Sequence, residues 1–322
     1  MSNVFDTVLL LALPASGKSE VRRFLDLQTP DACRKDFHMG PTVQLDDFPY
    51  VHLMRRVDDE LEKLGHRRLF FASGAKPFID PIDWGTLIEL INEDYADLHS
   101  AKIEQPASAA RHLMDRIERA GKKVGAPARL AGLDEAVAKT VAAAIEEEAA
   151  QLLKDKHNAY QPLEGKTKVI EFARGGAHGS AMPLEKPFGY QYSLGCLSEE
   201  ILSRSVILYI WVTPEESRRK NQARSNPADP GSILHHGVPI EVMMNDYGCD
   251  DMDWLERNTA KAGTVTVKAH GKTFHLPIAR FDNRVDKTSF LRADQKEWDA
   301  KAEADVRSAI KAAMDKLASF SS

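Results

Sequence analysis

A strand, a tight loop and a helix follow one another near the N-terminus, and this unit constrains the fold more than any other part of the sequence. Val8–Leu11 is a continuous apolar run, which is typical of a strand buried on both faces of a parallel sheet. A loop of small residues follows, and Val21, Phe24 and Leu25 then recur with helical spacing. Because parallel strands are joined by crossover helices, this unit predicts an α/β protein with a central parallel sheet.

The loop, residues 12–19, has the pattern of a phosphate-binding P-loop. It matches GxxxxGK[ST] at every fixed position except the first, where Ala12 replaces glycine. Backbone N–H groups of such a loop and the N-terminus of its helix surround phosphate oxygens. Lys18 would reach the β- and γ-phosphates, and Ser19 would bind Mg²⁺. The residues predicted to contact a nucleotide are Leu13, Pro14, Ala15, Ser16, Gly17, Lys18 and Ser19.

This interpretation has a plain alternative, which is an ordinary strand-to-helix turn. Ala12 is the departure from the pattern, because a Cβ restricts backbone angles that glycine tolerates. Alanine is small enough to fit if its φ angle is negative.

Two acidic residues, Asp46 and Asp47, follow the second predicted strand, Thr42–Leu45. The carboxyl ends of parallel strands line the ligand crevice of an open α/β sheet. A carboxylate there can accept a proton from a hydroxyl that attacks a γ-phosphate. The alternative is a solvent-exposed turn in which one of the two residues caps the next helix.

With the 12–19 loop, the segment Asp46-Asp47-Phe48-Pro49-Tyr50 resembles P-loop kinases of the uridine kinase, phosphoribulokinase, glycerate kinase and pantothenate kinase type. These enzymes carry Asp-x-Phe or Asp-Asp-Phe-Tyr at this place. The resemblance implies a three-layer P-loop domain, Asp46 as catalytic base, and an acceptor site shaped by Asp47 and Phe48. Pro49 departs from the family's spelling.

The third predicted strand, Lys168–Phe172, is also similar to this superfamily, which often has an acidic residue and an arginine after it. The resemblance implies that Glu171 helps to position Mg²⁺ or the acceptor and that Arg174 contacts phosphate. The implied metal ligands are Ser19, Asp46 and Glu171. An ordinary strand end with a flexible turn is the alternative.

A basic helix is predicted from Pro214, after a strong strand at 206–212. Nucleoside and nucleotide monophosphate kinases have a lid helix at this chain position. The resemblance implies that lid arginines stabilise the transferring phosphate, with the turn-rich residues 225–231 as hinge. These arginines are Arg218, Arg219 and Arg224. The alternative is a solvated basic helix face.

Asn283-Arg284-Val285-Asp286 is similar to the guanine-reading NKxD element of GTPases, with arginine in place of lysine. No DxxG element follows the third strand, which argues against a switch GTPase. P-loop kinases pack the adenine against a loop at this chain position, so the resemblance implies that Asn283 and Asp286 contact the base. A structural turn is the alternative.

The matching motifs divide the chain into a core of residues 1–99 and 166–292 and two further parts. Residues 100–165 are alanine-rich and charged, and they predict a helical insertion. Residues 293–322 predict a long C-terminal helix that packs on the core. We also expect a hairpin at 264–276 and short strands at 68–72 and 277–281.

Charge and composition limit the classes of function. Lys and Arg number 43 against 48 Asp and Glu, a net charge of −5, which argues against nucleic-acid or membrane binding driven by charge. No apolar run is long enough to span a bilayer. Three scattered cysteines fit a reducing cytoplasm and argue against a zinc site.

We therefore expect a cytoplasmic kinase that uses ATP and Mg²⁺ and phosphorylates a small hydroxyl or phosphate acceptor, such as a nucleoside, nucleotide or sugar. A homodimer is left open. One alternative is a P-loop protein acting on a polynucleotide or protein, with a groove lined by basic residues of the insertion. These residues are Arg116, Arg119, Lys122, Lys123 and Arg129. Another alternative is a regulator that binds nucleotide without turnover.

Overall fold

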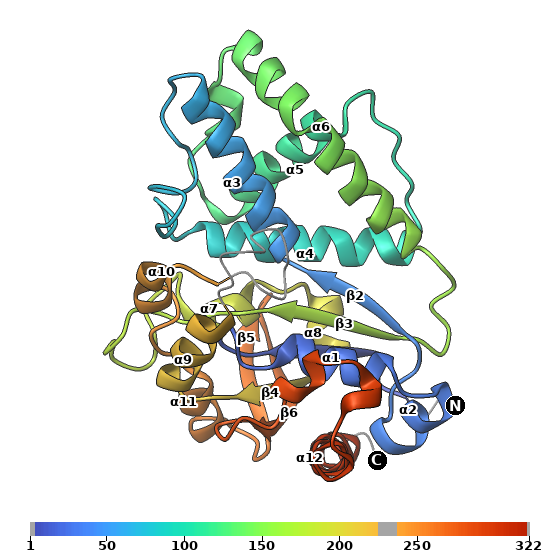
Figure 1. Cartoon of the computed structure of the whole chain (residues 1–322). Coiled ribbons are helices and arrows are strands. Elements are labelled where there is room, and N and C mark those ends of the chain that lie inside the picture. Colours follow the sequence, from blue (N-terminus) through green and yellow to red (C-terminus); the bar gives the residue numbers. More distant parts are fainter. Residues whose placement is uncertain (1–3, 225–236, 321–322) are drawn as a thin grey trace.

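The computed structural model describes residues 4–224 and 237–320, which form an α/β protein around a six-stranded sheet (Figure 1). The strand order is β2-β3-β1-β4-β6-β5. The strands are β1 (Thr7–Leu11), β2 (Thr42–Asp46), β3 (Thr167–Phe172), β4 (Ser205–Trp211), β5 (Thr264–Ala269) and β6 (Lys272–Asp282). All neighbours pair in parallel except β5 and β6, so the predicted, mostly parallel sheet is confirmed.

The order of the strands places the loop after β1 at a topological switch point of the sheet. The chain runs from the central β1 to the edge strand β2, returns to β3 and then crosses β1 to reach β4. The connections after β1 and β3 therefore lead to opposite sides of β1. Such a switch point, at the carboxyl ends of the strands, is where open α/β sheets bind ligands.

Helices cover both faces of the sheet, an arrangement compatible with a three-layer α/β fold. Side chains alternate along β1, so Val8 and Leu10 join one apolar cluster while Leu9 and Leu11 join another. The first cluster lies under α1 (Lys18–Asp26), α2 (Pro30–Phe37) and α12 (Ala300–Ala318). The second lies under α4 (Asp83–Ser100), α7 (Gly189–Cys196), α8 (Glu199–Arg204) and α11 (Met252–Arg257).

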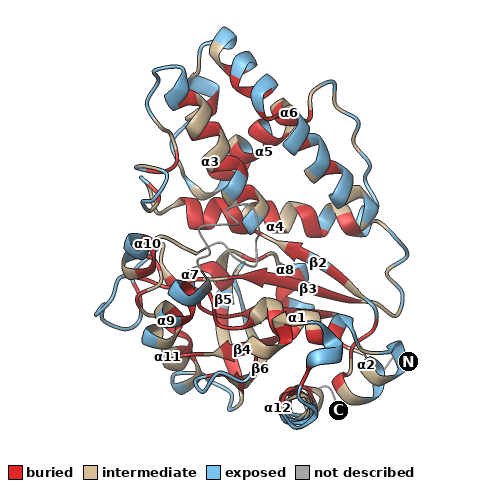
Figure 2. Cartoon of the chain, in the orientation of Figure 1, coloured by how far each residue is buried: buried red, intermediate tan, exposed pale blue. Residues whose placement is uncertain are grey.

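A helical region connects β2 to β3 and has an apolar cluster of its own. It consists of α3 (Phe48–Lys63), α4, α5 (Ala109–Val124) and α6 (Glu135–Asn158). Figure 2 shows that these helices bury the faces they turn toward one another and expose the outer ones. The helical region therefore extends beyond the predicted 100–165, because α3 and α4 share its core.

The strand predicted at residues 68–72 is wrong. This segment forms one isolated bridge, between Phe71 and Phe78. The carboxylate of Asp58 on α3 accepts the backbone N–H groups of Leu69, Phe70 and Phe71 at 2.6–3.2 Å. These donors are thus satisfied by a side chain rather than by a neighbouring strand.

The C-terminal part follows the prediction with one difference. The hairpin is present as β5 and β6, but the strand expected separately at 277–281 is the second half of β6, whose parallel partner is β4. The last long helix, α12, begins at Ala300 and is capped by Asp299. Two short helices, α9 (Pro214–Arg224) and α10 (Ile240–Asn245), flank residues 225–236. Within the described ranges, no helix is both long enough and apolar enough to cross a bilayer.

Candidate functional site

The 12–19 loop turns sharply into α1, which begins at Lys18. Gly17 has a φ of 103° and Ala15 a φ of 55°, so the backbone passes twice through the left-handed region. Ala12 has no positive φ, and its Cβ is therefore accommodated. The departure from the glycine of the sequence pattern causes no strain at this position.

Residues far along the chain hold the loop in this conformation. The side-chain amide of Asn283 donates hydrogen bonds to the Ser16 carbonyl at 2.7 Å and to the Thr288 hydroxyl at 2.9 Å. On the other side, the Ser217 hydroxyl of α9 donates to the Pro14 carbonyl at 2.7 Å. A Cβ at Gly17 would lie 2.5 Å from the Thr288 Oγ1 atom, so both crowding and the φ angle require glycine there.

The loop keeps polar groups that have no partner in the described part of the chain. The Ser16 hydroxyl oxygen is buried without a hydrogen bond, and Lys18 forms neither a hydrogen bond nor an ion pair with any described residue. No side chain caps the first turn of α1. An unsatisfied hydroxyl, a lysine and a helix N-terminus at one loop suit an anion such as a nucleotide phosphate.

Asp46 and Glu171 lie side by side at the carboxyl ends of β2 and β3. They are register partners in the parallel sheet, so their side chains share the face covered by α1. Lys18 is near enough to act on the Asp46 carboxyl electrostatically. The structure therefore brings together Lys18, Asp46 and Glu171, which come from three distant segments of the sequence.

Burial and negative neighbours change the proton affinity of Asp46. Desolvation is the largest cause, followed by Asp47 and Glu171, and together they raise the pKa of Asp46 to about 7. Lys18 and a hydrogen bond from the Phe48 N–H act in the opposite direction. That bond, 2.8 Å long, uses the Oδ1 atom of Asp46.

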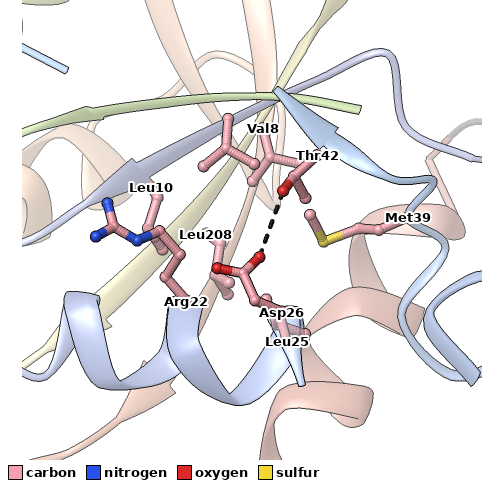
Figure 3. A pocket seen from close by; sticks show the side chains of 9 residues that line it. Val8, Leu10, Arg22, Leu25, Asp26, Met39, Thr42 and Leu208 are labelled. Atoms are coloured by element: carbon pink, nitrogen blue, oxygen red, sulfur yellow. Dashed lines mark hydrogen bonds between the residues drawn. The ribbon is translucent and has the colours of Figure 1, made fainter. Parts of the chain in front are cut away.

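The negative charge of Glu171 is balanced by Arg22, which was not among the predicted site residues. Arg22 donates a hydrogen bond to its Oε1 atom at 2.9 Å, and the Glu171 side chain is almost fully buried. Figure 3 shows the Arg22 guanidinium turned away from the Asp26–Thr42 hydrogen bond beneath α1. The apolar cavity there is only about 10 Å³, a packing gap rather than a ligand site. Arg22 follows Lys18 by one helical turn, so the sequence already indicated that both side chains lie on the same face of the helix.

The resemblance implied that Arg174 contacts phosphate, but the Arg174 side chain is buried and bound to other residues of the protein. It is 1% exposed and donates hydrogen bonds to the Asp47 carboxylate at 2.6 Å and to the Ser193 hydroxyl at 3.0 Å. Its guanidinium also lies over the rings of Trp84 and Phe172. Asp47, which follows Asp46 in the sequence, thus forms a buried ion pair with Arg174.

The three arginines predicted for a lid lie on α9 but do not act alike. Arg218 pairs with Glu215 at 3.1 Å, and its Nη1 atom is buried without a partner among the described residues. Arg219 is mostly exposed and pairs with Glu216. The side chain of Arg224 and the predicted hinge at 225–231 lie outside the described residues.

Asn283 and Asp286 are occupied within the protein rather than available to a base. Besides its two donated bonds, Asn283 accepts the Lys287 N–H at 2.7 Å and is fully buried. Asp286 pairs with the buried Lys220 of α9 at 3.1 Å. Hydrogen bonds from Ser289 and Thr288 and the charge of Lys220 outweigh burial and lower the pKa of Asp286. The segment therefore braces the 12–19 loop and α9.

A second buried carboxyl lies near the Asp47–Arg174 pair and gave no signal in the sequence. Burial raises the pKa of Asp246 to about 7, against a smaller opposing effect of Arg55. The next residue, Tyr247, packs its ring edge-on against Trp84 at 5.7 Å between centroids. These residues come from α3, α4 and the segment after α10, so the Asp47 side of the site lies where the helical region meets the sheet.

The basic groove considered for the helical insertion is not supported. Arg116 is buried and binds Glu93 and Asp94, and two further basic residues of the set are held in ion pairs. Lys123 binds Glu93 and Glu89, while Arg129 binds Asp83. Of the five residues proposed, Arg119 and Lys122 remain exposed without a described partner.

The strand order, the helices on both faces and the switch point after β1 define an α/β protein of the open-sheet class. Within residues 4–224 and 237–320, no group of three or more His, Cys, Asp or Glu side chains is placed to hold a metal ion. No family model, curated protein or solved structure matches this chain. Arguments about its function therefore rest on the geometry at this switch point.

Proposed function

We propose that this protein transfers a phosphoryl group from Mg²⁺-bound ATP to a small molecule that carries a hydroxyl or phosphate acceptor group. The observation that carries the proposal is the convergence of Lys18, Asp46 and Glu171 beside the unsatisfied Ser16 hydroxyl. A cation, two carboxylates and open loop donors at one sheet edge are the groups that phosphoryl transfer needs.

The 12–19 loop and α1 would bind the triphosphate. N–H groups at the start of α1 and the Ser16 hydroxyl would donate to phosphate oxygens, and Lys18 would neutralise the charge that develops on them. Ser19 follows Lys18 on α1 and would bind Mg²⁺, with Asp46 as the nearby carboxylate. The metal ion supplies charge neutralisation at the β- and γ-phosphates when it is bound.

Asp46 would act as the base. Its Oδ1 atom is engaged by the Phe48 N–H, while Oδ2 forms no hydrogen bond with a described residue. A pKa of about 7 suits a group that must accept a proton near neutral pH. The acceptor hydroxyl would give its proton to Oδ2 as its oxygen attacks the γ-phosphorus, and the nucleoside diphosphate would leave.

The charges of the helical region support a small acceptor over a macromolecular one. Arg116, Lys123 and Arg129 form ion pairs with carboxylates of this protein, which argues against a basic track for a polynucleotide. The acceptor would bind where the helical region approaches Asp46. A nucleoside, a nucleotide or a sugar-like compound carries the hydroxyl or phosphate that the proposal requires.

The experiment is ADP release from Mg·ATP across a panel of nucleosides, nucleotides, sugars and cofactor precursors. We expect one compound class to stimulate the wild-type protein, and Asp46→Asn to lose roughly two to four orders of magnitude of that rate. Asp115→Asn, the same change of side chain at an exposed position of α5, is the matched comparison and should keep the wild-type rate. Binding of Mg·ATP with no stimulated release by any compound would contradict the proposed kinase and favour a nucleotide-binding regulator.

A further inference from the structure

A groove lies on the opposite face of the sheet from α1, beside the edge strand β5. Its volume is about 400 Å³, and it is lined by α7, the end of α11, β5 and Lys186. We call it the β5 groove. Its volume falls within the range of small-molecule sites, which is roughly 300–1,000 Å³. The gap beneath α1, at about 10 Å³, is far smaller.

The walls of the β5 groove combine a flat apolar surface with positive charge. Trp254 of α11 lies next to Val265 and Val267 of β5, which supply an apolar floor. Lys186 and Lys268 also line the groove, and neither forms an ion pair with a described residue. No aspartate or glutamate is among the lining residues.

Both lysines are exposed, so their ammonium groups are open to a ligand in the groove. The lining of the β5 groove thus combines two unpaired ammonium groups with the side chain of Trp254. A ligand that satisfies both features carries a negative charge on a planar, apolar body.

One wall residue shows that the space is open. Gly195 of α7 lines the groove, and a Cβ built on it meets no atom within 4 Å. Its φ angle is not in the left-handed region, so a larger side chain fits the helix backbone there. A substitution at Gly195 would therefore fill the groove without disturbing the packing of α7.

The groove is distinct from the site around Asp46. Its α7 wall carries Ser193 on the same helix, and the Ser193 hydroxyl contacts Arg174 rather than the groove. None of the residues that line the groove belongs to the 12–19 loop or contacts it in a described hydrogen bond.

From these observations we infer that the β5 groove is a second ligand site, which binds a small planar anion such as an aromatic carboxylate or sulfonate. Trp254 stacks against the planar body, and Lys186 and Lys268 neutralise its charge. This inference does not depend on the proposed phosphoryl transfer.

The test uses 8-anilinonaphthalene-1-sulfonate as an anionic planar probe and N-phenyl-1-naphthylamine as its uncharged analogue. We expect saturable binding of the sulfonate to the folded wild-type protein, with energy transfer from Trp254 that Trp254→Phe reduces. Gly195→Phe should weaken binding by roughly tenfold or more, and Lys186→Glu with Lys268→Glu should do the same. Gly132→Phe is the control, because a Cβ at Gly132 also meets no atom within 4 Å.

Three results would overturn the inference. The first is a sulfonate affinity that neither Gly195→Phe nor the lysine pair changes, and the second is equal affinity for the uncharged analogue. The third is the absence of saturable binding to a wild-type protein shown to be folded by circular dichroism. The lysine pair lies at the surface, so it keeps the test decisive if Gly195→Phe fails to fold.

Discussion

Asp46 shows how one residue depends on its neighbours for its chemistry. It ends β2 beside Glu171 and precedes Asp47, and the charge of Lys18 at the start of α1 acts on it. Burial and the two carboxylates favour the neutral acid more strongly than Lys18 favours the carboxylate. Its pKa is therefore raised to about 7.

This environment makes a prediction for stability against pH. In the unfolded chain the Asp46 carboxyl loses its proton near pH 4. In the folded protein it keeps this proton until about pH 7. Over this range the folded state binds more protons at Asp46, so the contribution of Asp46 to the unfolding free energy falls as the pH rises. Above about pH 7 the folded wild type must bury the charged Asp46 carboxylate, whereas the Asn side chain of Asp46→Asn is neutral at every pH.

We therefore expect the unfolding free energy of Asp46→Asn to exceed that of the wild type at pH 8. The difference should shrink as the pH falls and disappear near pH 4 or below. Denaturant unfolding of both proteins across this range measures the difference. A variant less stable than the wild type at pH 8 would show that the Asp46 carboxylate is stabilised by the fold, contrary to its surroundings.

At the scale of single residues, the sequence was informative where a motif was local. Lys18, Ser19 and the start of α1 follow from the 12–19 loop itself. Arg174 and Asn283 were also identified as important, but their partners lie far along the chain. Burial of both side chains therefore could not be read from the local pattern.

The Asp47–Arg174 pair connects the start of α3 to the end of β3, and it carries a prediction about these elements. Arg174 is fully buried and Asp47 nearly so. Removing only the arginine leaves a buried carboxylate without its partner, which typically costs about 3–5 kcal/mol of stability. We expect Arg174→Met to lose about this much in chemical denaturation.

The double substitution Asp47→Asn with Arg174→Met removes both charges and should recover part of the loss. Arg174→Lys keeps the charge but not the planar set of donors, so it should lie between Arg174→Met and the wild type. An Arg174→Met protein with wild-type stability and weakened nucleotide binding would instead support the phosphate contact that the resemblance had implied.

At the scale of elements, the sheet strands followed from apolar runs because strands buried on both faces leave that pattern. The segment 68–72 has similar composition, yet Asp58 takes its backbone donors and no strand forms. The boundary of the helical region was also missed, because its cluster joins α3 and α4 to α5 and α6 across long stretches of sequence. Both errors arise from tertiary contacts.

Ion pairs, some buried and some exposed, balance much of the positive charge of the helical region. The helical region carries many basic residues, but ion pairs with Glu93, Asp94 and Asp83 hold three of the five considered for a groove. The net charge of −5 adds a further unfavourable term for polyanions.

We accordingly expect no saturable binding of single-stranded or duplex oligonucleotides at about 0.15 M salt. Fluorescence anisotropy of labelled oligonucleotides checks this. Binding that weakens steeply with added salt, and that Arg119→Glu with Lys122→Glu abolishes, would restore the macromolecular alternative.

Calorimetric titration with Mg²⁺ and a non-hydrolysable ATP analogue measures whether the 12–19 loop binds the phosphates of a nucleotide, as we propose. The wild type and Lys139→Ala, which removes an exposed lysine of α6, should bind with equal affinity. Lys18→Ala should bind roughly tenfold more weakly or worse, at an unchanged unfolding midpoint. Equal affinity in Lys18→Ala, or no binding to the folded wild type, would contradict the account.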